Sequence, residues 1–439
     1  MTLSTPELLD RRARLLGPAY RLFYEQPLHP VRGEGVWLFD ADGRRYLDAY
    51  NNVASVGHCR PEVVQAIAAQ AAVLNTHTRY LHEGVLALAE RLLATMPAGL
   101  QAGDGHAMFT CTGSEANDLA LRIAQAHTGG TGLIITQWAY HGVTAPLAGA
   151  SPSLGPQQPL GSNVVTVPLP LRAPHSEIGP RFAEGVRQAI ATLAQRGLRP
   201  AALLLDTVCS SDGVLTHPAG WLNEAVNSVR AAGGVFIADE VQPGFGRTGE
   251  AFWGFARHGT PAAPLVPDIV TMGKPMGNGH PVAGLVARAE VLAAFGRQCR
   301  YFNTFGGNPV AMAAANAVLD VIEREGLQAN ALHTGVVLRQ RLAALGRRHA
   351  AIGAVRGAGQ FIGLDLVDAT QGRDDGFAPA PALTQRVVNG LRQRGVLISA
   401  TGPEASTLKI RPPLVFTEAH AALLADTLDA VLTELENAA

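Results

Sequence analysis

Two residues of this sequence have the side-chain types and the surroundings that amine chemistry needs. Lys274 lies in the glycine-rich segment IVTMGKPMGNGHP, and Asp239 closes the apolar run of GVFIADEVQPGFGRTG, 35 residues earlier (274 − 239). An amine among glycines, proline and methionines is poorly solvated, so its pKa should fall and part of it should be the neutral nucleophile that condenses with an aldehyde. An acid at the end of a buried parallel strand lies where open α/β sheets bind ligands, and a carboxylate there can keep a heteroaromatic nitrogen protonated. Together the two residues predict pyridoxal phosphate as a cofactor.

A third segment has the form of a phosphate-binding turn. In FTCTGSEANDLALRIAQAH an apolar strand is expected to end near Thr110, Gly113 allows a tight turn, and Ser114 begins a helix. Backbone amides and the helix dipole at such a position point at whatever anion lies there. The alternative is an ordinary capped helix, with Ser114 as N-cap and Asn117 in the place of a capping-box residue. A lone lysine, strand-end acid or Gly-Ser turn is more often structural, so the hypothesis depends on all three together.

Two further segments could contribute to the same site. WAYHG follows an apolar run at 133–136, so Tyr140 is expected in a strand-end loop on the ligand side of the sheet. An aromatic ring there could stack on a flat cofactor, although a position in the core or at the rim is the commoner role. YFNTFGGNP offers Thr304 and a glycine pair before a helix that begins near Pro309, a second arrangement that suits a phosphate.

The elements that must position these residues alternate along most of the chain. Short apolar runs alternate with segments of helical period, which predicts an α/β fold with a mostly parallel central sheet and flanking helices. The expected strands are 106–110, 133–136, 201–206, 234–239, 268–272 and 282–287, and the expected helices include 114–127 and 219–232.

Length and pattern also predict two domains. With 439 residues and 47% hydrophobic content, the chain exceeds the usual size of one domain. Residues 36–50 predict two strands around an Asp-Gly turn, and the chain returns to helices and short strands after about residue 310. We therefore expect a large cofactor-binding domain of 61–310 and a small domain built from 1–60 and 311–439. The segment 151–182 is rich in Pro, Gly and Ser and is assigned no regular structure.

Composition argues against several other classes of function. The net charge is −1 and 16% of the residues are charged, so there is no basic field for nucleic acid, and Arg11, Arg12 and Arg14 are expected on a solvated helix face. No apolar run approaches the roughly 20 residues that a membrane helix needs, and MTLSTPELLDRR lacks the apolar region of a secretory signal, which predicts a soluble cytoplasmic protein. The four cysteines show neither disulfide nor metal-ligand spacing, so no metal is predicted.

Several motifs occur in an order that resembles a known family. GSEANDLALR, AYHG, IADEVQPGFGRTG, VTMGKPMGNGHPV, FNTFGGNP and LKIRPPL resemble the class III pyridoxal-phosphate-dependent aminotransferases over nearly the whole chain. NNVASVGHCRPEVV, NTHTRYLHE and GKPMGNGHPVA are similar in particular to the branch that contains the ethanolamine-phosphate phospho-lyases and related bacterial transaminases. The resemblance implies a fold type I enzyme with pyridoxal 5'-phosphate, active as a homodimer, or a multiple of it, with shared active sites.

The resemblance also implies a role for each matching residue. Lys274 would bind the cofactor covalently and move the proton, and Asp239 would pair with the ring nitrogen. Gln242 would contact the ring hydroxyl, and Val241 would pack behind the ring. The remaining cofactor contacts would be Gly113 and Ser114 to the phosphate, Tyr140 on the ring face, and Thr304 to the phosphate of the neighbouring subunit.

The expected activity is that of an omega-type transaminase, which moves an amino group from an amine or amino acid to a 2-oxo acid such as pyruvate. The same apparatus could instead expel phosphate from O-phosphoethanolamine or a similar phosphorylated amino alcohol, and the motifs fit both reactions. A third hypothesis, a protein that binds the cofactor without turnover, is disfavoured by the intact Lys274 and Asp239.

The substrate side departs from the common family pattern. Many class III aminotransferases have a Glu and an Arg that act as a switch for the substrate carboxylate, where this chain has Asp206 and Lys409, with Arg411 two residues further on. An ammonium binds a carboxylate less specifically than a guanidinium fork, though Lys409 and Arg411 would share a strand face in an extended backbone. The alternative is that either cation is a solvated edge charge. His77, Arg79 and His82 are further candidates for an anion site, each more often structural.

Overall fold

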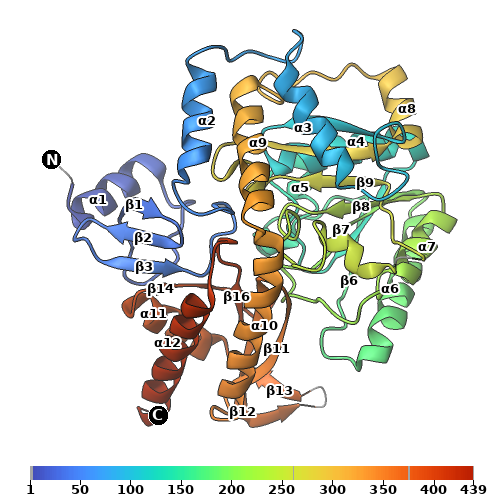
Figure 1. Cartoon of the computed structure of the whole chain (residues 1–439). Coiled ribbons are helices and arrows are strands. Elements are labelled where there is room, and N and C mark those ends of the chain that lie inside the picture. The colour runs from blue at the N-terminus through green and yellow to red at the C-terminus, as the bar shows by residue number, and fades with distance from the viewer. Residues whose placement is uncertain (1–2, 261, 374–375, 439) are drawn as a thin grey trace.

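A seven-stranded sheet forms the centre of the larger part of the molecule (Figure 1). The structure is a computed structural model that describes residues 3–260, 262–373 and 376–438. The strand order is β4-β10-β9-β8-β7-β5-β6, parallel from β9 to β6, with β10 antiparallel to both of its neighbours. The mostly parallel sheet predicted from the sequence is thus confirmed. Its strands are β4 (Gly105–Thr110), β5 (Gly132–Thr136), β6 (Val164–Val167), β7 (Pro200–Asp206), β8 (Val235–Asp239), β9 (Ile269–Met272) and β10 (Ala283–Arg288).

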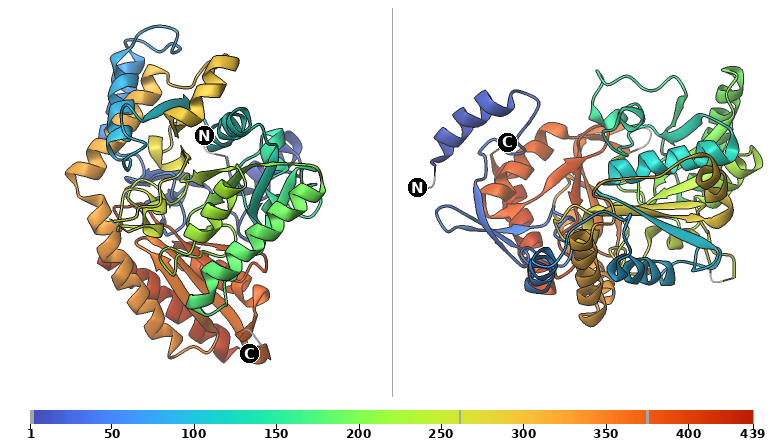
Figure 2. Two further views of the ribbon diagram at one scale, coloured as in Figure 1. Left: turned by 90° about the vertical axis from the view of Figure 1, so that its right-hand side faces the viewer. Right: turned by 90° about the horizontal axis from the view of Figure 1, so that it is seen from above.

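Both faces of this sheet are buried, which explains why its strands read as continuous apolar runs. In β8, Val235 and Ile237 belong to one hydrophobic cluster, and Phe236 and Ala238 belong to another. Helices α4 and α8 contribute to the first cluster, and α2, α3, α6, α7 and α9 to the second. Helices lie on both sides of the central sheet (Figure 2). These helices and the short α5 are α2 (Pro61–Ala71), α3 (Glu83–Ala94), α4 (Gly113–Thr128), α5 (Ala145–Ala148), α6 (His175–Gln195), α7 (Asn223–Ala231), α8 (Ala289–Gln298) and α9 (Pro309–Arg324).

The two ends of the chain pack together beside the central sheet. Strand β14 near the C-terminus pairs in parallel with β3, and Leu47 shares a hydrophobic cluster with Leu424 and Val431 of α12. The expected pair of strands around the Asp-Gly turn is present as β2 and β3. The elements outside the central sheet are α1 (Thr5–Leu16), β1 (Pro30–Glu34), β2 (Trp37–Asp40), β3 (Arg45–Asp48), α10 (Leu327–Gly346), β11 (Ile352–Ala358), β12 (Phe361–Arg373), β13 (Gly376–Pro379), α11 (Pro381–Gln393), β14 (Val396–Leu397), β15 (Ser399–Thr401), β16 (Thr407–Ile410) and α12 (Glu418–Asn437).

The domain boundaries at 60/61 and 310/311 remain a prediction. Helix α9 lies almost wholly after residue 310, and its buried face, including Met312 and Val318, belongs to the larger hydrophobic core. The basic residues near the start of the chain lie on α1, which buries none of its side chains. None of the helices in the described part of the chain is both long enough and apolar enough to cross a membrane.

Two expectations about local structure were wrong. The segment 151–182, assigned no regular structure, contains a 3₁₀ turn at Pro152–Leu154, the strand β6 and the start of α6. The strand is a short edge strand of four residues, and Pro180 lies inside α6, so neither element shows a clear period in the sequence. The helix expected at 219–232 begins only at Asn223, because residues 219–222 form a turn.

The C-terminal helix is fixed by a buried histidine that contacts two carboxylates. His349 is 3% exposed, and its Nε2 and Nδ1 lie 2.7 Å and 2.9 Å from Asp429 and Glu436 of α12. Burial alone would lower the pKa of His349, but the hydrogen bonds to Asp429 and Glu436 outweigh it and raise this pKa above its ordinary value of 6.5. A raised pKa in the folded state means that folding favours the protonated form.

We therefore expect His349→Gln to destabilise the protein by about 1–3 kcal/mol at pH values below 6.5, where the imidazolium is charged in both states. The difference between wild type and variant should shrink as the pH rises through the folded-state pKa of His349. Urea unfolding at several pH values between about 5.5 and 9 measures this difference, and a difference that is constant over the range would contradict the assignment.

Candidate active site

Three polar side chains lie in a row where the central strands end. The backbone register pairs Asp206 of β7 with Asp239 of β8, and Asp239 with Thr271 of β9. Because side chains alternate along a strand, Asp239 lies on the same face as Val235 and Ile237, the face that α4 covers. The carboxyl ends of parallel strands thus gather two acids and a hydroxyl under the first turns of α4.

The two acids of this row line a cavity of about 290 Å³. Eight of the residues predicted from the sequence line it, and the other three, Thr304, Lys409 and Arg411, do not. The eight come from five different strand ends and from the turns that follow them, so the fold brings together positions that are up to 161 residues apart (274 − 113). The eight lining residues are Gly113, Ser114, Tyr140, Asp206, Asp239, Val241, Gln242 and Lys274.

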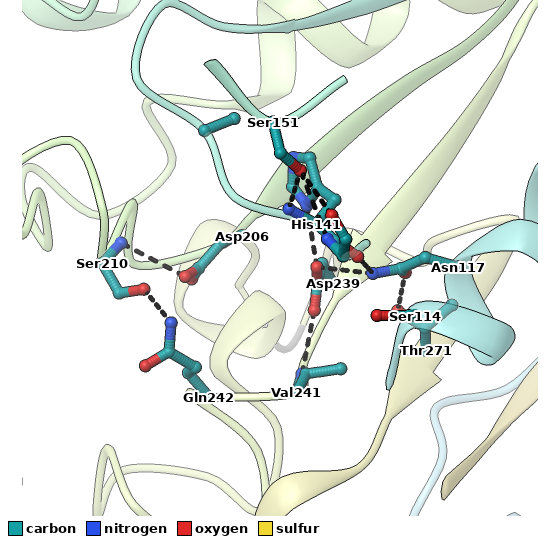
Figure 3. A network of polar contacts seen from close by, with 12 residues as sticks. Ser114, Asn117, His141, Ser151, Asp206, Ser210, Asp239, Val241, Gln242 and Thr271 are labelled. Atoms are coloured by element: carbon teal, nitrogen blue, oxygen red, sulfur yellow. Dashed lines mark hydrogen bonds and ion pairs between the residues drawn. The ribbon is translucent and has the colours of Figure 1, made fainter. Parts of the chain in front are cut away.

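Asp239 is the most heavily hydrogen-bonded acid of the cavity (Figure 3). Its Oδ2 accepts from Asn117 Nδ2 at 2.9 Å and lies 2.8 Å from His141 Nδ1, and its Oδ1 accepts from the Val241 backbone N–H at 3.1 Å. Burial alone would raise the pKa of Asp239, but the hydrogen bond and charge of His141, the charge of Lys274 and the amide of Asn117 lower it below its ordinary value. Asp239 is therefore an ionised carboxylate although its side chain is buried.

The pKa of the neighbouring acid, Asp206, is shifted in the opposite direction. Burial, followed by the charge of Asp239, raises the pKa of Asp206, although the backbone N–H groups of Val208 and Ser210 donate to its carboxylate. The two acids in the row thus have pKa values that are pushed apart, which is a property of sites that carry out acid–base chemistry.

Lys274 follows β9 and opens a 3₁₀ turn, Lys274–Gly277. Burial and then the charge of Arg411 lower the pKa of Lys274, against the opposing effect of Asp239 and Asp206. Its Nζ lies 5.9 Å from the centre of the Tyr140 ring. The prediction of an amine with depressed basicity thus agrees with the surroundings that the structure gives it.

The start of α4 leaves its first amides available on the cavity wall. Thr112 is the N-cap, accepting from the Glu115 N–H at 3.1 Å, while the Glu115 carboxylate accepts the Thr112 N–H at 2.9 Å. The alternative with Ser114 as N-cap is therefore wrong, and Ser114 lies in the first helical turn, whose N–H groups have no intrahelical acceptor. A Cβ on Gly113 would lie 3.0 Å from the Val241 side chain, a tight contact that the glycine avoids.

Lys409 and Arg411 lie behind the cavity wall and contact it through intermediaries. Lys409 Nζ donates to the Ser210 carbonyl at 3.2 Å, and Arg411 donates to the Gln242 side-chain oxygen and to Asn52. Their exposed fractions are 9% and 6%, so neither is a solvated edge charge. Asp206 and Lys409 both contact Ser210 and are not within ion-pair distance of each other.

Thr304 and the other candidates lie outside the cavity of this chain. Thr304 is exposed, and its neighbour Phe305 is 68% exposed. His77 stacks on Tyr80 with ring centres 5.0 Å apart, and Arg79 lies over the Phe302 ring. His82 caps α3 by accepting from the Gly84 N–H.

Sequence reasoning missed four residues that organise the site. Asn117, His141 and Thr271 surround Asp239, and Ser210 connects Asp206, Gln242 and Lys409. Aligning the ends of the predicted parallel strands could have found Thr271, and His141 adjoins Tyr140 in WAYHG. Asn117 was considered only as a capping residue, although it follows Gly113 by one helical turn.

Comparison with known proteins agrees with this geometry. A family model for the class-III aminotransferases matches residues 23–432. The chain is 40% identical to a Drosophila melanogaster alanine–glyoxylate aminotransferase 2-like protein, over 95% of this chain and 85% of the relative. It is 35% identical to a Caenorhabditis elegans ethanolamine-phosphate phospho-lyase homolog, over 98% of this chain and 94% of that relative. A solved Arthrobacter phospholyase in complex with phosphoethanolamine is 44% identical with a TM-score of 0.90, covering 97% of this chain and 99% of that one.

The chain therefore belongs to the class-III aminotransferase family, whose fold is that of the type I pyridoxal-phosphate enzymes. Pyridoxal 5'-phosphate is the cofactor of this family. The residues present fit it, because the same cavity offers an amine of lowered pKa, a buried ionised carboxylate and the open N-terminus of a helix. Among the described residues no group of three or more His, Cys, Asp and Glu side chains could hold a metal ion.

Lys274 and Lys409 are the only lysines in the 439 residues, which makes covalent attachment of the cofactor easy to assign. We expect borohydride reduction of the loaded protein to fix the cofactor on the peptide that contains Lys274. Lys274→Ala should abolish turnover and labelling while weak cofactor binding remains, because the contacts at the α4 N-terminus do not involve the lysine. Peptide mass spectrometry reads the label, with Lys409→Met as the matched control that should keep it. Label on Lys409 in the wild type would show that the base is assigned wrongly.

Proposed function

We propose that this protein is a transaminase that takes the amino group of a small amine or amino acid bearing an anionic group and passes it to a 2-oxo acid such as pyruvate. The observation that carries the proposal is the presence of Lys274 and Asp239 in one cavity, with the pKa of each lowered. Bound pyridoxal 5'-phosphate supplies an aldehyde that captures amines and a ring that accepts the electron pair of a broken bond.

The residues of the chain have distinct tasks in this proposal. The Nζ of Lys274 would hold the cofactor aldehyde and, as a neutral amine, would take the proton from the carbon next to the substrate amine and return it. Asp239 holds a proton at the ring nitrogen. Tyr140 lies beside Lys274 and would cover the ring face, and the N–H groups of Gly113 and Ser114 would bind the phosphate.

The preference for an anionic substrate rests on two buried cations. Lys409 Nζ is held by a backbone carbonyl, and Arg411 is held by two neutral amide side chains and the face of the Tyr50 ring. Neither cation has a carboxylate within 4 Å in the part of the chain that the structure describes. Burial lowers the pKa of both Lys409 and Arg411, so the charged form of each is disfavoured, and a substrate carboxylate or phosphate that reached them would stabilise that form and be bound by it.

The composition of the chain supports a functional role for Lys409. Of the 35 basic residues, 33 are arginines (35 − 2), so lysine is used almost nowhere else. Many class III aminotransferases have an arginine at the position of Lys409, where this chain has a lysine. Because an ammonium is a compact charge without a planar fork, this exchange favours an anion that does not need bidentate binding.

A phospho-lyase activity is the second candidate. It is favoured by the similarity to the Arthrobacter phospholyase that binds phosphoethanolamine and to the phospho-lyase homolog of Caenorhabditis elegans. The same proton removal by Lys274 would release phosphate if the substrate carried it on the carbon next to the deprotonated one. The two activities therefore differ in the substrate and in the need for a 2-oxo acid.

We also propose a homodimer, or a multiple of it, in which Thr304 of one subunit reaches the cofactor phosphate of the other. Support comes from the exposure of Thr304 beside Phe305, and from Tyr80 and Leu81, which are 66% and 104% exposed. A cytoplasmic location belongs to the same proposal, because the four cysteines are all unpaired, as reducing compartments favour.

Two assays on the loaded enzyme distinguish the candidates. With an anionic amine donor such as β-alanine and with pyruvate, we expect alanine to form and no reaction when pyruvate is omitted. O-phosphoethanolamine is tested separately without any 2-oxo acid. Prompt release of inorganic phosphate and acetaldehyde in that second assay would contradict the transaminase assignment and support the lyase.

The role of Lys409 is tested in the same assays. Lys409→Met should raise KM for the anionic donor about tenfold or more and change KM for an uncharged arylalkylamine little, because only the former needs a cation. Lys409→Arg serves as the charge-conserving control. Equal effects on both donors would mean that Lys409 is structural.

A further inference from the structure

We infer that Asn117 and His141 are positioning residues that occupy one oxygen of the Asp239 carboxylate and so leave the other oxygen for the ring nitrogen of the cofactor. This inference rests on the cofactor and on the role of Asp239 given above. Both residues line the cavity, and their proposed effect on the chemistry runs through the carboxylate of Asp239.

The hydrogen-bonding capacity of the carboxylate carries the argument. A carboxylate offers about four acceptor sites, two on each oxygen. Oδ2 takes two donors, Asn117 Nδ2 at 2.9 Å and His141 Nδ1 at 2.8 Å, so its capacity is filled (Figure 3). Oδ1 accepts one N–H, that of Val241 at 3.1 Å, among the described residues. One site therefore remains, on Oδ1, and Asp239 lines the cavity.

The orientation of Asn117 is fixed by its other contacts. The Thr271 hydroxyl donates to Asn117 Oδ1 at 2.6 Å, and Nδ2 donates both to Asp239 and to the His141 carbonyl, at 2.9 Å each. Turning the amide over would place its oxygen against a carboxylate and a carbonyl oxygen. Because the backbone register sets Thr271 beside Asp239, the sheet itself selects the amide orientation that donates to the acid.

The orientation of His141 is fixed in a similar way. Its backbone N–H donates to the Ser151 hydroxyl at 2.9 Å, and the Gly142 N–H contacts the same oxygen. Facing an ionised carboxylate, Nδ1 must carry the ring proton. The ring is 3% exposed, and its Nε2 has no hydrogen-bond partner in the described part of the chain. The contact with Asp239 is thus the only polar contact of this ring there.

Comparing two ligands, one with and one without the ring nitrogen, distinguishes an effect on Asp239 from a general effect on the structure of the site. We propose to titrate the refolded or cofactor-stripped full-length protein with pyridoxal 5'-phosphate and with its 1-deaza analogue, in which a carbon replaces the ring nitrogen, and to follow fluorescence quenching. The wild type should bind the natural cofactor more tightly. The variants are His141→Phe and Asn117→Leu, which keep most of the volume and remove the donor, and His141→Asn, which returns an N–H donor near the position of Nδ1.

His141→Phe and Asn117→Leu should weaken binding of the natural cofactor about tenfold or more, whereas binding of the analogue should change less than about twofold. His141→Asn should recover part of the lost preference. Ser151→Ala loosens the same loop without touching Asp239 and should weaken both ligands by the same factor. The inference is overturned if the two donor-removing variants weaken both ligands equally or weaken neither.

Failure of the inference can be told apart from failure of the function on which it rests. If the wild type prefers the natural cofactor and the variants keep that preference, Asp239 has its role and the two positioning residues do not have theirs. If the wild type binds both ligands equally, Asp239 does not pair with the ring nitrogen, and the proposed function fails together with the inference. Retained analogue binding in each variant also shows that the variant is folded.

Discussion

A carboxylate that stays ionised while buried is the constraint on which the rest of the site depends. Moving an isolated charge out of water is unfavourable, and the cost is offset here by three hydrogen bonds and by the neighbouring Lys274. Two of the donors reach Asp239 from outside its own strand, one from α4 and one from the loop after β5. The pKa of Asp239 is therefore a property of the packing of several elements.

The same packing also shifts the pKa values of the other charged side chains around the cavity. Asp206 adjoins Asp239 in the sheet, and its pKa rises because burial and the neighbouring charge both oppose ionisation. After burial, which is the larger cause for each, the charge of Arg411 lowers the pKa of both Lys274 and Lys409. The pKa of Lys274 is thus lowered by burial first and by the charge of Arg411 second, which favours the neutral amine relative to an exposed lysine. A substrate anion that binds the cations would weaken that repulsion, so substrate binding and the basicity of Lys274 are coupled.

Much of this could be predicted from the sequence, because the signals are local. The apolar runs around Asp239 and before Lys274 identify buried strands, and the strand-turn-helix pattern at Gly113 predicts an anion site. The contacts that set the electrostatics are not local. His141 and Asn117 meet Asp239 across 98 and 122 residues, and only the strand order and register bring them there. The edge strand β6 was missed for a related reason, since four residues flanked by Gly and Pro carry too little periodic signal.

The contacts of the two proposed substrate-binding cations were even harder to predict from the sequence. Lys409 lies on β16 and Arg411 directly follows that strand, but the side-chain contacts of both are made with Ser210 and Gln242, which lie on other elements. Ser210 follows β7 and contacts Asp206, Gln242 and Lys409 together, through its amide, its hydroxyl and its carbonyl. A single residue that joins three functional side chains through three different groups leaves no pattern in a sequence.

The protonation state of the ring nitrogen is the most direct test of this account. Pyridoxal 5'-phosphate labelled with ¹⁵N in the ring, bound to the full-length protein and observed by ¹⁵N NMR, reports whether that nitrogen carries a proton. We predict the chemical shift of a protonated ring nitrogen in the wild type across neutral pH, and that of an unprotonated one in Asp239→Asn, whose neutral amide cannot hold the charge. An unprotonated nitrogen in the wild type, or the same shift in both proteins, would contradict the central role of the buried carboxylate.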